Sequence, residues 1–265
     1  MNRATEMNVR FYDQFAPYYP AVYGFLDAEA TVGQWVRLLE REGLVPSETA
    51  RFRRKPKLLD AGCGPAWFLA AWAQAGFEVA GVDASPSMLR LARQEWSRRS
   101  PAIAPRLVQT DLCDVNGLPF APGAMEIVVC HSHLPNLIHP EDLPAFLRNL
   151  IACLRPGGCL AFDHTRIVAS TPNGTEEHSI PSGGALLRTS RYEPDVRRCV
   201  QTWQGDRFTG EETYWLHDTN DLDTIAQYYG ASLWKRMEWA PDQPHHPFLP
   251  ETAGSERLVS LYRRL

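Results

Sequence analysis

LLDAGCGPA, at residues 58–66, is a short apolar run that leads directly into a glycine-rich turn. Gly62 and Gly64 permit positive φ angles and close approach of the backbone to a ligand. A helix starting after this turn would offer free backbone N–H groups to an anionic group. A second apolar segment ends in Asp83, where a carboxylate can accept hydrogen bonds from two ribose hydroxyls. These segments together predict a strand–turn–helix–strand unit that binds a nucleoside-containing cofactor.

Two classes of cofactor use such a turn, the nicotinamide or flavin dinucleotides and S-adenosylmethionine. The dinucleotide fingerprint has a third glycine or alanine three residues after the second glycine, so that helix and strand pack closely around a pyrophosphate. Trp67 stands at that position. An indole would obstruct this close packing, so the sequence favours S-adenosylmethionine.

These residues resemble the class I S-adenosylmethionine-dependent methyltransferases, whose first motif follows a pattern like LDxGCGxG. The resemblance continues in the family's order through GVDASPSMLRLAR at 81–93, Asp111, MEIVVCHSHL at 125–134 and LRPGGCLAFDH at 154–164. The chain departs from the first motif at Pro65 and Ala66, where the family often has Thr and Gly. The nearest resemblance is to the glycine and glycine–sarcosine N-methyltransferases, through residues 82–102, 154–167 and the YDQ at 12–14. His133 stands where those enzymes have an asparagine, which puts glycine itself in doubt as the acceptor.

The pattern of segments predicts an α/β fold, a Rossmann-like doubly wound sheet of seven strands with an inserted antiparallel β lid. Apolar strands near 57–61, 78–82, 106–109, 125–130 and 158–163 alternate with helical periodicity, which is typical of a parallel sheet covered on both faces. Strands near 233–239 and 257–263 are expected to form an antiparallel hairpin at the edge. Ser85 followed by Pro86 is a typical helix start.

Four segments are predicted. Residues 1–56 form an N-terminal helical lid and linker, and residues 57–165 form the cofactor-binding core. Residues 166–220 form the antiparallel β insertion over the substrate, with segments near 184–192, 196–204 and 208–217 separated by turn residues. Residues 221–265 supply a helix and the edge strands that complete the sheet.

The resemblance implies which residues contact the cofactor. Gly62, Cys63 and Gly64 would bring backbone N–H groups to its methionine part together with Asp60, and Asp83 would bind the ribose diol. Asp111 and Leu112 would bind the adenine ring, which Ala84 and Met88 would line. His131 would touch the methionine part. Tyr19 would reach the cofactor carboxylate with its hydroxyl, although Tyr12, Tyr18 and Tyr19 are equally compatible with an aromatic cluster that caps a helix.

The candidates for catalysis and acceptor binding follow the predicted fourth and fifth strands, where open α/β sheets bind ligands. His131, His133 and His164 are candidate bases, and Asn136, His164 and Arg166 are candidate acceptor contacts. Arg191 and Tyr214 of the insertion could add a carboxylate clamp and an aromatic wall. The expected reaction is N-methylation of a small amine. The alternatives are O-methylation with a histidine base and a cofactor-binding protein without transferase activity.

Composition narrows the partners. The chain of 265 residues has a formal net charge of −4, which disfavours nucleic acid as a substrate. The basic run between Arg51 and Lys57 is interpreted as a solvated linker. Six cysteines without a CxxC pair are expected to be buried and reduced, in the cytoplasm. No apolar run predicts a membrane contact, and the pairs His131/His133 and His245/His246 lack further ligands for a metal. The N-terminal aromatic segment could close the site or pack on a second subunit in a homodimer.

Overall fold

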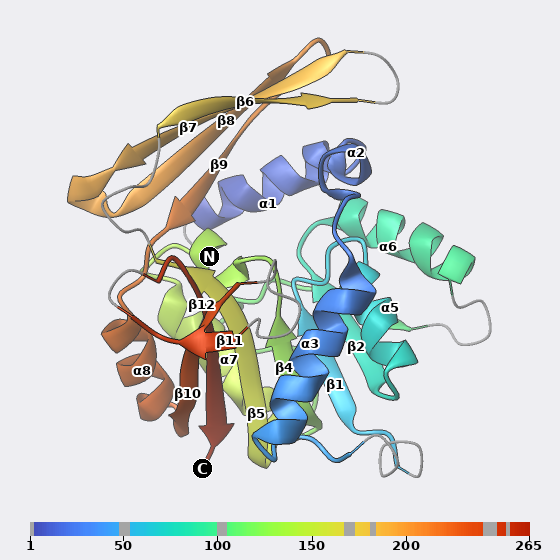
Figure 1. Cartoon of the computed structure of the whole chain (residues 1–265), viewed down its shortest axis with the longest axis vertical. Coiled ribbons are helices and arrows are strands. Elements are labelled where there is room, and N and C mark those ends of the chain that lie inside the picture. Colours follow the sequence, from blue (N-terminus) through green and yellow to red (C-terminus); the bar gives the residue numbers. More distant parts are fainter. Residues whose placement is uncertain are drawn as a thin grey trace.

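The computed structural model describes residues 3–47, 54–99, 105–166, 173–180, 184–240, 248–252 and 255–265. Two separate sheets lie one above the other, with the N-terminal helix between them (Figure 1). Arg51 and Arg53 of the basic run and the pair His245/His246 lie outside the described residues. Within the described part, no helix is long and apolar enough to cross a membrane.

The larger sheet has eight strands in the order β11-β10-β12-β5-β4-β1-β2-β3. Five of them run parallel: β1 (Lys57–Ala61), β2 (Glu78–Asp83), β3 (Arg106–Gln109), β4 (Met125–Cys130) and β5 (Leu154–Thr165). The remaining three run antiparallel to their neighbours: β10 (Ala231–Trp239), β11 (Phe248–Pro250) and β12 (Arg257–Arg264). The predicted fold class is confirmed, including the antiparallel pair β10–β12.

Strand β11 is the difference from the predicted seven strands. It has three residues, Phe248–Pro250, and pairs with the end of β10. A run of three residues is too short to show the period of two that reveals a strand. Its pairing depends on the neighbouring strand, which the local sequence does not show. The outermost position of the sheet therefore belongs to β11 and not to β10.

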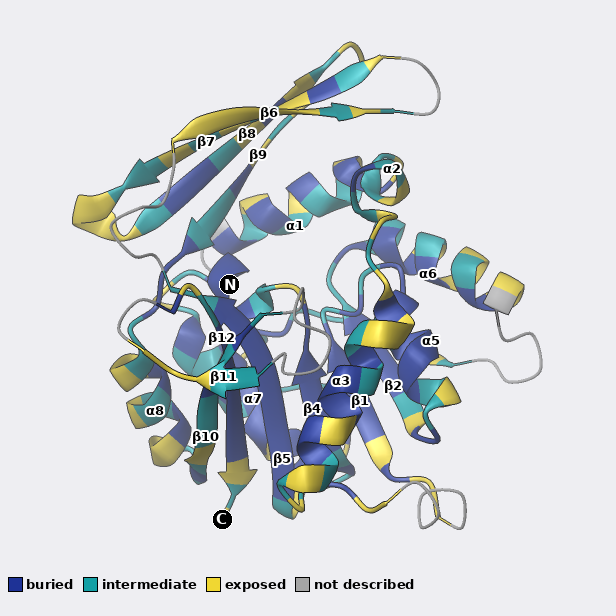
Figure 2. Cartoon of the chain, viewed as in Figure 1, coloured by how far each residue is buried: buried dark blue, intermediate teal, exposed yellow. Residues whose placement is uncertain are grey.

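Helices cover both faces of this sheet (Figures 1 and 2). On one face, α3 (Ala28–Arg41) and α5 (Trp67–Gln74) bury a cluster that includes Trp35 and Trp72. On the other face, α7 (Leu143–Cys153) and α8 (Thr219–Tyr228) bury Phe146 and Leu222. The helix α6 (Pro86–Arg99) packs against α5 through Ala92 and Trp96. All six cysteines are buried and free.

Local signals place most of the element ends. The Ser85 hydroxyl accepts a hydrogen bond from the Met88 N–H at 3.1 Å, which confirms Ser85 as the cap of α6. Helix α7 ends at Cys153, and β5 begins at once with Leu154, four residues before the predicted strand. Gly158 lies in this strand. Glycine is required at this position because a Cβ atom would come within 2.9 Å of two backbone oxygens, those of Arg155 and Glu126.

The smaller sheet is antiparallel, in the order β6-β7-β8-β9. Its strands are β6 (Gly174–Ser179), β7 (Ala185–Glu193), β8 (Arg198–Gly205) and β9 (Phe208–Trp215). The last three confirm the predicted segments. Strand β6 reads GTEEHS and was not predicted, because its residues are polar and mostly exposed.

Helices α1 (Arg3–Phe15) and α2 (Tyr19–Tyr23) pack on the smaller sheet through an aromatic cluster. The rings of Phe15 and Trp203, both fully buried, lie 4.9 Å apart. This apolar contact holds α1 against the smaller sheet. Together they lie over the carboxyl ends of the parallel strands (Figure 1). The division of the chain into four segments stays a prediction.

Candidate functional site

The glycine turn after β1 leaves a bare stretch of backbone. Gly62 and Gly64 both have positive φ, +72° and +49°. A Cβ atom on Gly62 would come within 2.6 Å of the Leu134 side chain and would displace it, whereas a Cβ atom on Gly64 would meet nothing within 4 Å. Ala66, at the position where the family often has glycine, also adopts a left-handed conformation with φ of 61° and begins α5. The turn therefore exposes its backbone to open space, as a site for a close-fitting ligand requires.

Asp83 at the end of β2 lies across from this turn. One carboxylate oxygen accepts a hydrogen bond from the Gly64 N–H at 2.8 Å and the other from the Ser85 N–H at 2.9 Å. Burial raises the pKa of Asp83 to about 6, although these backbone hydrogen bonds oppose the shift. Each oxygen keeps a further lone pair. The carboxylate is thus held in place and can still accept hydrogen bonds from a diol.

A cleft of about 770 Å³, with its solvent-open mouth included, connects the turn, Asp83 and helix α1. The cofactor residues predicted from the sequence gather along it: Tyr19, Gly62, Gly64, Asp83, Ala84, Met88, Asp111, Leu112 and His131. The cleft also receives residues that the sequence did not indicate: Thr5, Asn8, Val9, Tyr12, Ser85, Ser132, Leu134, Leu137 and Ile138.

A smaller adjoining cavity of about 320 Å³ holds the other end of the predicted site. It shares Tyr19, Gly62, Gly64, His131 and Ser132 with the main cleft and adds Asp60 and Cys63. Both carboxylate oxygens of Asp60 are buried and have no hydrogen-bond partner among the described residues. Burial, and then the charge of Asp83, raise the pKa of Asp60 well above its ordinary value. A buried carboxylate without a partner is costly, and a cationic ligand group would complete it.

Comparisons with known proteins agree with this geometry. Residues 58–158 match the family model described as "Methyltransferase domain". A putative methyltransferase, YqeM of Bacillus subtilis, is 29% identical over 145 residues, which cover 55% of this chain and 53% of that protein. A malonyl-[acyl-carrier protein] O-methyltransferase of Pseudescherichia vulneris is 32% identical over 156 residues, 58% of this chain and 56% of that protein. These alignments span little more than half of each relative.

The sequence similarity to methyltransferases is centred on residues 58–158. Solved structures extend the similarity of fold over the whole chain. An S-adenosylmethionine-dependent methyltransferase of Clostridium acetobutylicum has a TM-score of 0.73 at 16% identity, covering 96% of this chain and 98% of its own. A sugar N-methyltransferase of a Streptoalloteichus species has a TM-score of 0.65 at 20% identity, covering 95% and 93%. The fold of this chain, with the smaller sheet included, is therefore similar to that of known methyltransferase structures.

S-adenosylmethionine is the predicted cofactor, and the described residues fit it. Asp60 offers an unpartnered carboxylate to the methionine ammonium group, and Asp83 offers two acceptors to the ribose diol. Asp111 accepts a hydrogen bond from the Cys113 N–H at 2.8 Å and lines the cleft beside Leu112. Tyr19 lines both cavities and also packs on Tyr23, so its place in the aromatic cluster is compatible with the predicted lid contact. The individual contacts remain predictions.

His131 is the one histidine that lines the cleft among the described residues. Its Nε2 atom accepts a hydrogen bond from the Trp72 indole N–H at 2.9 Å. An indole N–H can only donate, so the ring proton of His131 lies on Nδ1. Burial lowers the pKa of His131 to about 4, against a smaller opposing effect of Asp163. The ring is therefore neutral at neutral pH and presents an N–H donor, which suits a contact to the cofactor better than a role as a base.

Replacing Trp72 by Phe should release this ring. In the unaltered protein, a proton on Nε2 of His131 would face the indole N–H of Trp72, which is also a donor. Without that N–H, the pKa of His131 is expected to rise from about 4 by about one pKa unit or more. The measurement is an NMR titration of the imidazole. Trp35→Phe is the matched control, since the Trp35 ring lies 4.5 Å from the same histidine with no hydrogen bond to it. Equal pKa values in the two variants would contradict this account.

The turn after β4 places His133, a second candidate base, outside the described lining of the cleft. Ser132 and His133 both have positive φ, near 59° and 58°, an uncommon conformation for residues other than glycine. The His133 N–H donates to Asp163, and its Nδ1 atom lies 3.0 Å from the Thr165 hydroxyl. Burial lowers the pKa of His133, more than Asp163 raises it. The turn thus directs Ser132 into the cleft, and the catalytic role of His133 stays a prediction without a contact to the cleft.

Asn136 is fully buried in the short 3-10 helix η1 (Leu134–Leu137). Its side-chain amide donates to the backbone oxygens of Thr165 and Trp215 at 3.1 Å and 2.7 Å, and its oxygen accepts from the Thr165 N–H at 2.8 Å. These bonds join η1, β5 and β9 and use most of the amide's capacity. They account for the residue structurally, and an acceptor contact stays a prediction.

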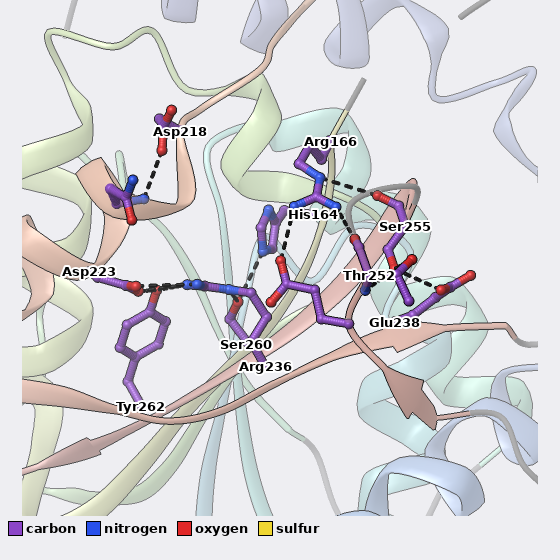
Figure 3. Close-up of polar contacts among 12 residues, drawn as sticks. His164, Arg166, Asp218, Asp223, Arg236, Glu238, Thr252, Ser255, Ser260 and Tyr262 are labelled. Carbon is purple, nitrogen blue, oxygen red and sulfur yellow. Dashed lines mark hydrogen bonds and ion pairs between the residues drawn. The ribbon is translucent and has the colours of Figure 1, made fainter. Parts of the chain in front are cut away.

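His164 and Arg166 lie at the end of β5, on the side of the C-terminal strands (Figure 3). His164 Nε2 is 3.0 Å from the Ser260 hydroxyl, and burial lowers the pKa of His164 well below its ordinary value. The Arg166 guanidinium donates to the Glu251 carboxylate at 3.0 Å and to the backbone oxygens of Thr252 and Ser255. Neither residue lines the described part of the cleft, so their predicted roles as base and acceptor contact lack support from the geometry.

The two predicted residues of the smaller sheet differ in position. Arg191 is exposed and ion-paired with Glu193 at 2.5 Å. Tyr214 faces α1 and donates its hydroxyl proton to Glu212 at 3.2 Å. Glu212 was not predicted, although strand alternation places it on the same face as Phe208 and Tyr214. Across the described residues, no group of three His, Cys, Asp or Glu side chains could hold a metal ion.

Helix α1 is fastened over the cleft by polar contacts. Asn8 donates to the backbone oxygens of Leu137 and Thr213, both at 2.8 Å, and so joins η1 to β9. Asp13 accepts from the Ser87 N–H at 2.9 Å and from the Ser85 hydroxyl at 3.0 Å, at the start of α6. Burial raises the pKa of Asp13, but the hydrogen bonds from Ser87 and Ser85 lower the pKa by more, so the net change is downward. Asp13 therefore links the lid to the loop that holds Asp83.

The replacement Asp13→Ala should weaken the binding of S-adenosylhomocysteine by about five- to tenfold, because α1 loses its attachment beside the ribose site. Loss of a capping carboxylate should also cost about 1 kcal/mol of stability. The measurements are calorimetric titration and thermal unfolding. Asp27→Ala removes a similar cap, the acceptor of the Ala30 N–H, from α3. It should cost the same stability with no loss of affinity, and equal affinities in both variants would disprove the link.

Proposed function

We propose that this protein transfers the methyl group of S-adenosylmethionine to the nitrogen of a small-molecule amine. The bound cofactor supplies a methyl group that is already activated, so the protein has to hold the acceptor lone pair in line with it and keep water out. The described residues are arranged for such positioning. The glycine turn, Asp60 and Asp83 would hold the cofactor, and α1 covers the cleft in which the acceptor would lie.

The observation that supports nitrogen is that the histidine of the described cleft lining is not arranged to act as a base. A hydroxyl acceptor usually needs a base, whereas an amine can arrive neutral. His131, the histidine of the described cleft lining, has Nε2 occupied by Trp72 and a pKa of about 4. None of the described lining residues is Lys or Arg. The cleft therefore offers little to a hydroxyl acceptor or to an anionic one.

The comparisons support this choice in part. The sugar N-methyltransferase of similar fold aligns over more than nine-tenths of both chains, the smaller sheet included. The relatives named malonyl-[acyl-carrier protein] O-methyltransferase align over a smaller part, 40% to 68% of this chain. Their name makes O-methylation of an acyl-carrier-protein substrate the second candidate. Glycine and sarcosine are possible acceptors under the first candidate, N-methylation of a small amine. A cytoplasmic location and a homodimer stay predictions.

The test measures release of S-adenosylhomocysteine with matched acceptors. The panel pairs amino sugars with the same sugars bearing a hydroxyl, and adds glycine, sarcosine and malonyl-acyl carrier protein. We expect turnover with an amine, rising with pH as the neutral amine fraction rises, and none with its hydroxyl partner. Methylation of a hydroxyl or of the malonyl thioester would overturn the proposal. Tight binding of cofactor with no turnover on any acceptor would support the binding-protein alternative.

A further inference from the structure

Glu212 is a fully buried carboxylate in the middle of β9, facing helix α1. One of its oxygens accepts a hydrogen bond from the Trp203 indole N–H at 2.9 Å. The other accepts from the hydroxyls of Tyr12 at 2.8 Å and Tyr214 at 3.2 Å. Burial raises the pKa of Glu212, and the hydrogen bonds from Tyr12, Trp203 and Tyr214 oppose that rise. Three donors around one carboxylate are the arrangement that favours its charged form.

The direction of these hydrogen bonds fixes the role of Tyr12. A phenol has one proton to donate, and Tyr12 gives that proton to Glu212. Its oxygen keeps a lone pair and can only accept a further hydrogen bond. Tyr12 lines the cleft together with Tyr19, Gly62 and Gly64. A ligand group that reached the Tyr12 oxygen from the cleft would therefore meet a hydrogen-bond acceptor backed by the buried Glu212 carboxylate.

The charge of Glu212 is poorly balanced on the side of the cleft. Arg188 of β7 is a cation that lowers the pKa of Glu212. Its guanidinium is itself ion-paired with Glu176 and lies 5.4 Å from the Trp203 ring. None of the described residues lining the cleft carries a positive side chain. A cationic or N–H-bearing group in the cleft would thus gain from Tyr12, and a group without a proton to donate would not.

We propose that Glu212, acting through the Tyr12 hydroxyl, selects acceptors that bear an N–H or ammonium group. Tyr12 binds that group directly, and Glu212 is a positioning residue that holds the hydroxyl proton away from the cleft. This inference rests on the proposed transfer to an amine and assigns the residues that recognise it. Tyr12 lies on α1 and Glu212 on the smaller sheet, so acceptor recognition requires both parts of the lid.

The test needs no knowledge of the natural acceptor. Sinefungin is an analogue of the cofactor that carries an amine where the cofactor carries its transferable methyl, whereas S-adenosylhomocysteine carries nothing there. The ratio of their dissociation constants, measured by calorimetric titration at neutral pH, reports how the cleft treats an amine at that point. A purely structural role of Glu212 would change both constants alike and leave the ratio unchanged.

Glu212→Gln is the decisive variant. Its oxygen can still accept from Trp203, but its NH2 group would donate to Tyr12 and turn the phenol proton toward the cleft. The preference for sinefungin over S-adenosylhomocysteine should fall by about tenfold. Tyr12→Phe should give a similar loss and carries the test if the Gln variant does not fold. Glu211→Gln is the matched control. Glu211 directly precedes Glu212 and is exposed on the opposite face of β9, so its replacement removes the same charge and should leave the ratio unchanged.

An unchanged ratio in Glu212→Gln and Tyr12→Phe, with intact binding of S-adenosylhomocysteine, would overturn this inference alone. An equal loss in Glu211→Gln would overturn it too, because the effect would then be one of overall charge. Binding of neither ligand to the unaltered protein would overturn both this inference and the proposed function. Discovery of a hydroxyl acceptor would overturn the proposed function while leaving the measured ratio intact.

Discussion

Asp83→Ala is expected to weaken the binding of S-adenosylhomocysteine by at least about 100-fold. Two effects add. The variant loses the carboxylate that would accept both ribose hydroxyls, and hydrogen bonds to a charged group are worth about 1.5–3 kcal/mol each. It also leaves the N–H groups of Gly64 and Ser85 without their acceptor, which loosens the turn itself. The measurement is calorimetric titration of the purified protein.

The matched control is Asp114→Ala. Asp114 also accepts a hydrogen bond from the backbone N–H two residues later, that of Asn116 at 2.8 Å, in an exposed turn that does not line the described cleft. This variant should bind S-adenosylhomocysteine like the unaltered protein. Affinity within about threefold in Asp83→Ala would refute the assignment of the ribose site.

The same residue predicts a pH dependence with a definite sign. Burial raises the pKa of Asp83 from 3.8 to about 6 in the free protein. Ionised Asp83 is the form that accepts the diol, so cofactor affinity should fall as pH drops through about 6. For folding the sign is opposite. A carboxyl with a raised folded-state pKa contributes stability below 3.8 that is lost as pH rises through about 6. Both dependences should be reduced in Asp83→Ala.

Asp60→Asn is the second large effect, and it should move stability and affinity in opposite directions. In the free protein both oxygens of Asp60 are buried without a partner, and its pKa is raised by burial and by the charge of Asp83. The neutral amide removes the cost of a buried charge, so the melting temperature of the free protein should rise by several degrees. The cofactor's ammonium group loses its counter-charge, and S-adenosylhomocysteine should bind about 10- to 100-fold more weakly.

A truncated ligand distinguishes this effect from general damage. 5′-Methylthioadenosine keeps the adenosine part of the cofactor and lacks the amino acid. Asp60→Asn should bind it as the unaltered protein does, while Asp83→Ala should lose it together with S-adenosylhomocysteine. Should Asp60→Asn lose both ligands equally, the assignment of Asp60 to the ammonium end would be wrong.

Some of the site could be predicted because it is written in short stretches of the chain. A strand, two glycines and a helix within 58–74 fix the backbone of the turn, and the turn's geometry fixes where Asp83 must lie after the next strand. Ser85 caps α6 by accepting a hydrogen bond from Met88, three residues later in the chain. Local chemistry decides such features, since the interacting groups are adjacent in sequence. The short strands β6 and β11 were missed because they have no such local signal.

The histidines show where local reasoning stops. The position of His131 and His133 after the fourth strand was predicted correctly, whereas His164 lies within β5 and not beyond it. Proximity to the cleft edge suggested a base. The pKa and tautomer of His131 depend on Trp72, 59 residues earlier in the chain. His164 is occupied by Ser260, 96 residues later. A histidine's protonation is set by what surrounds it, and packing of distant elements supplies those surroundings.

The sequence by itself therefore determined the parallel core, the glycine turn and the acids that would bind the cofactor. Only the tertiary structure decided what covers the cleft. Tyr12 and Glu212 are 200 residues apart, and no sequence pattern pairs Tyr12 of the YDQ stretch with Glu212. They meet because an apolar cluster holds α1 against the smaller sheet, and the proton between them has a direction only once both side chains are buried together. Burial and hydrogen-bond direction are properties of the assembled layers, so the recognition of the acceptor is encoded there.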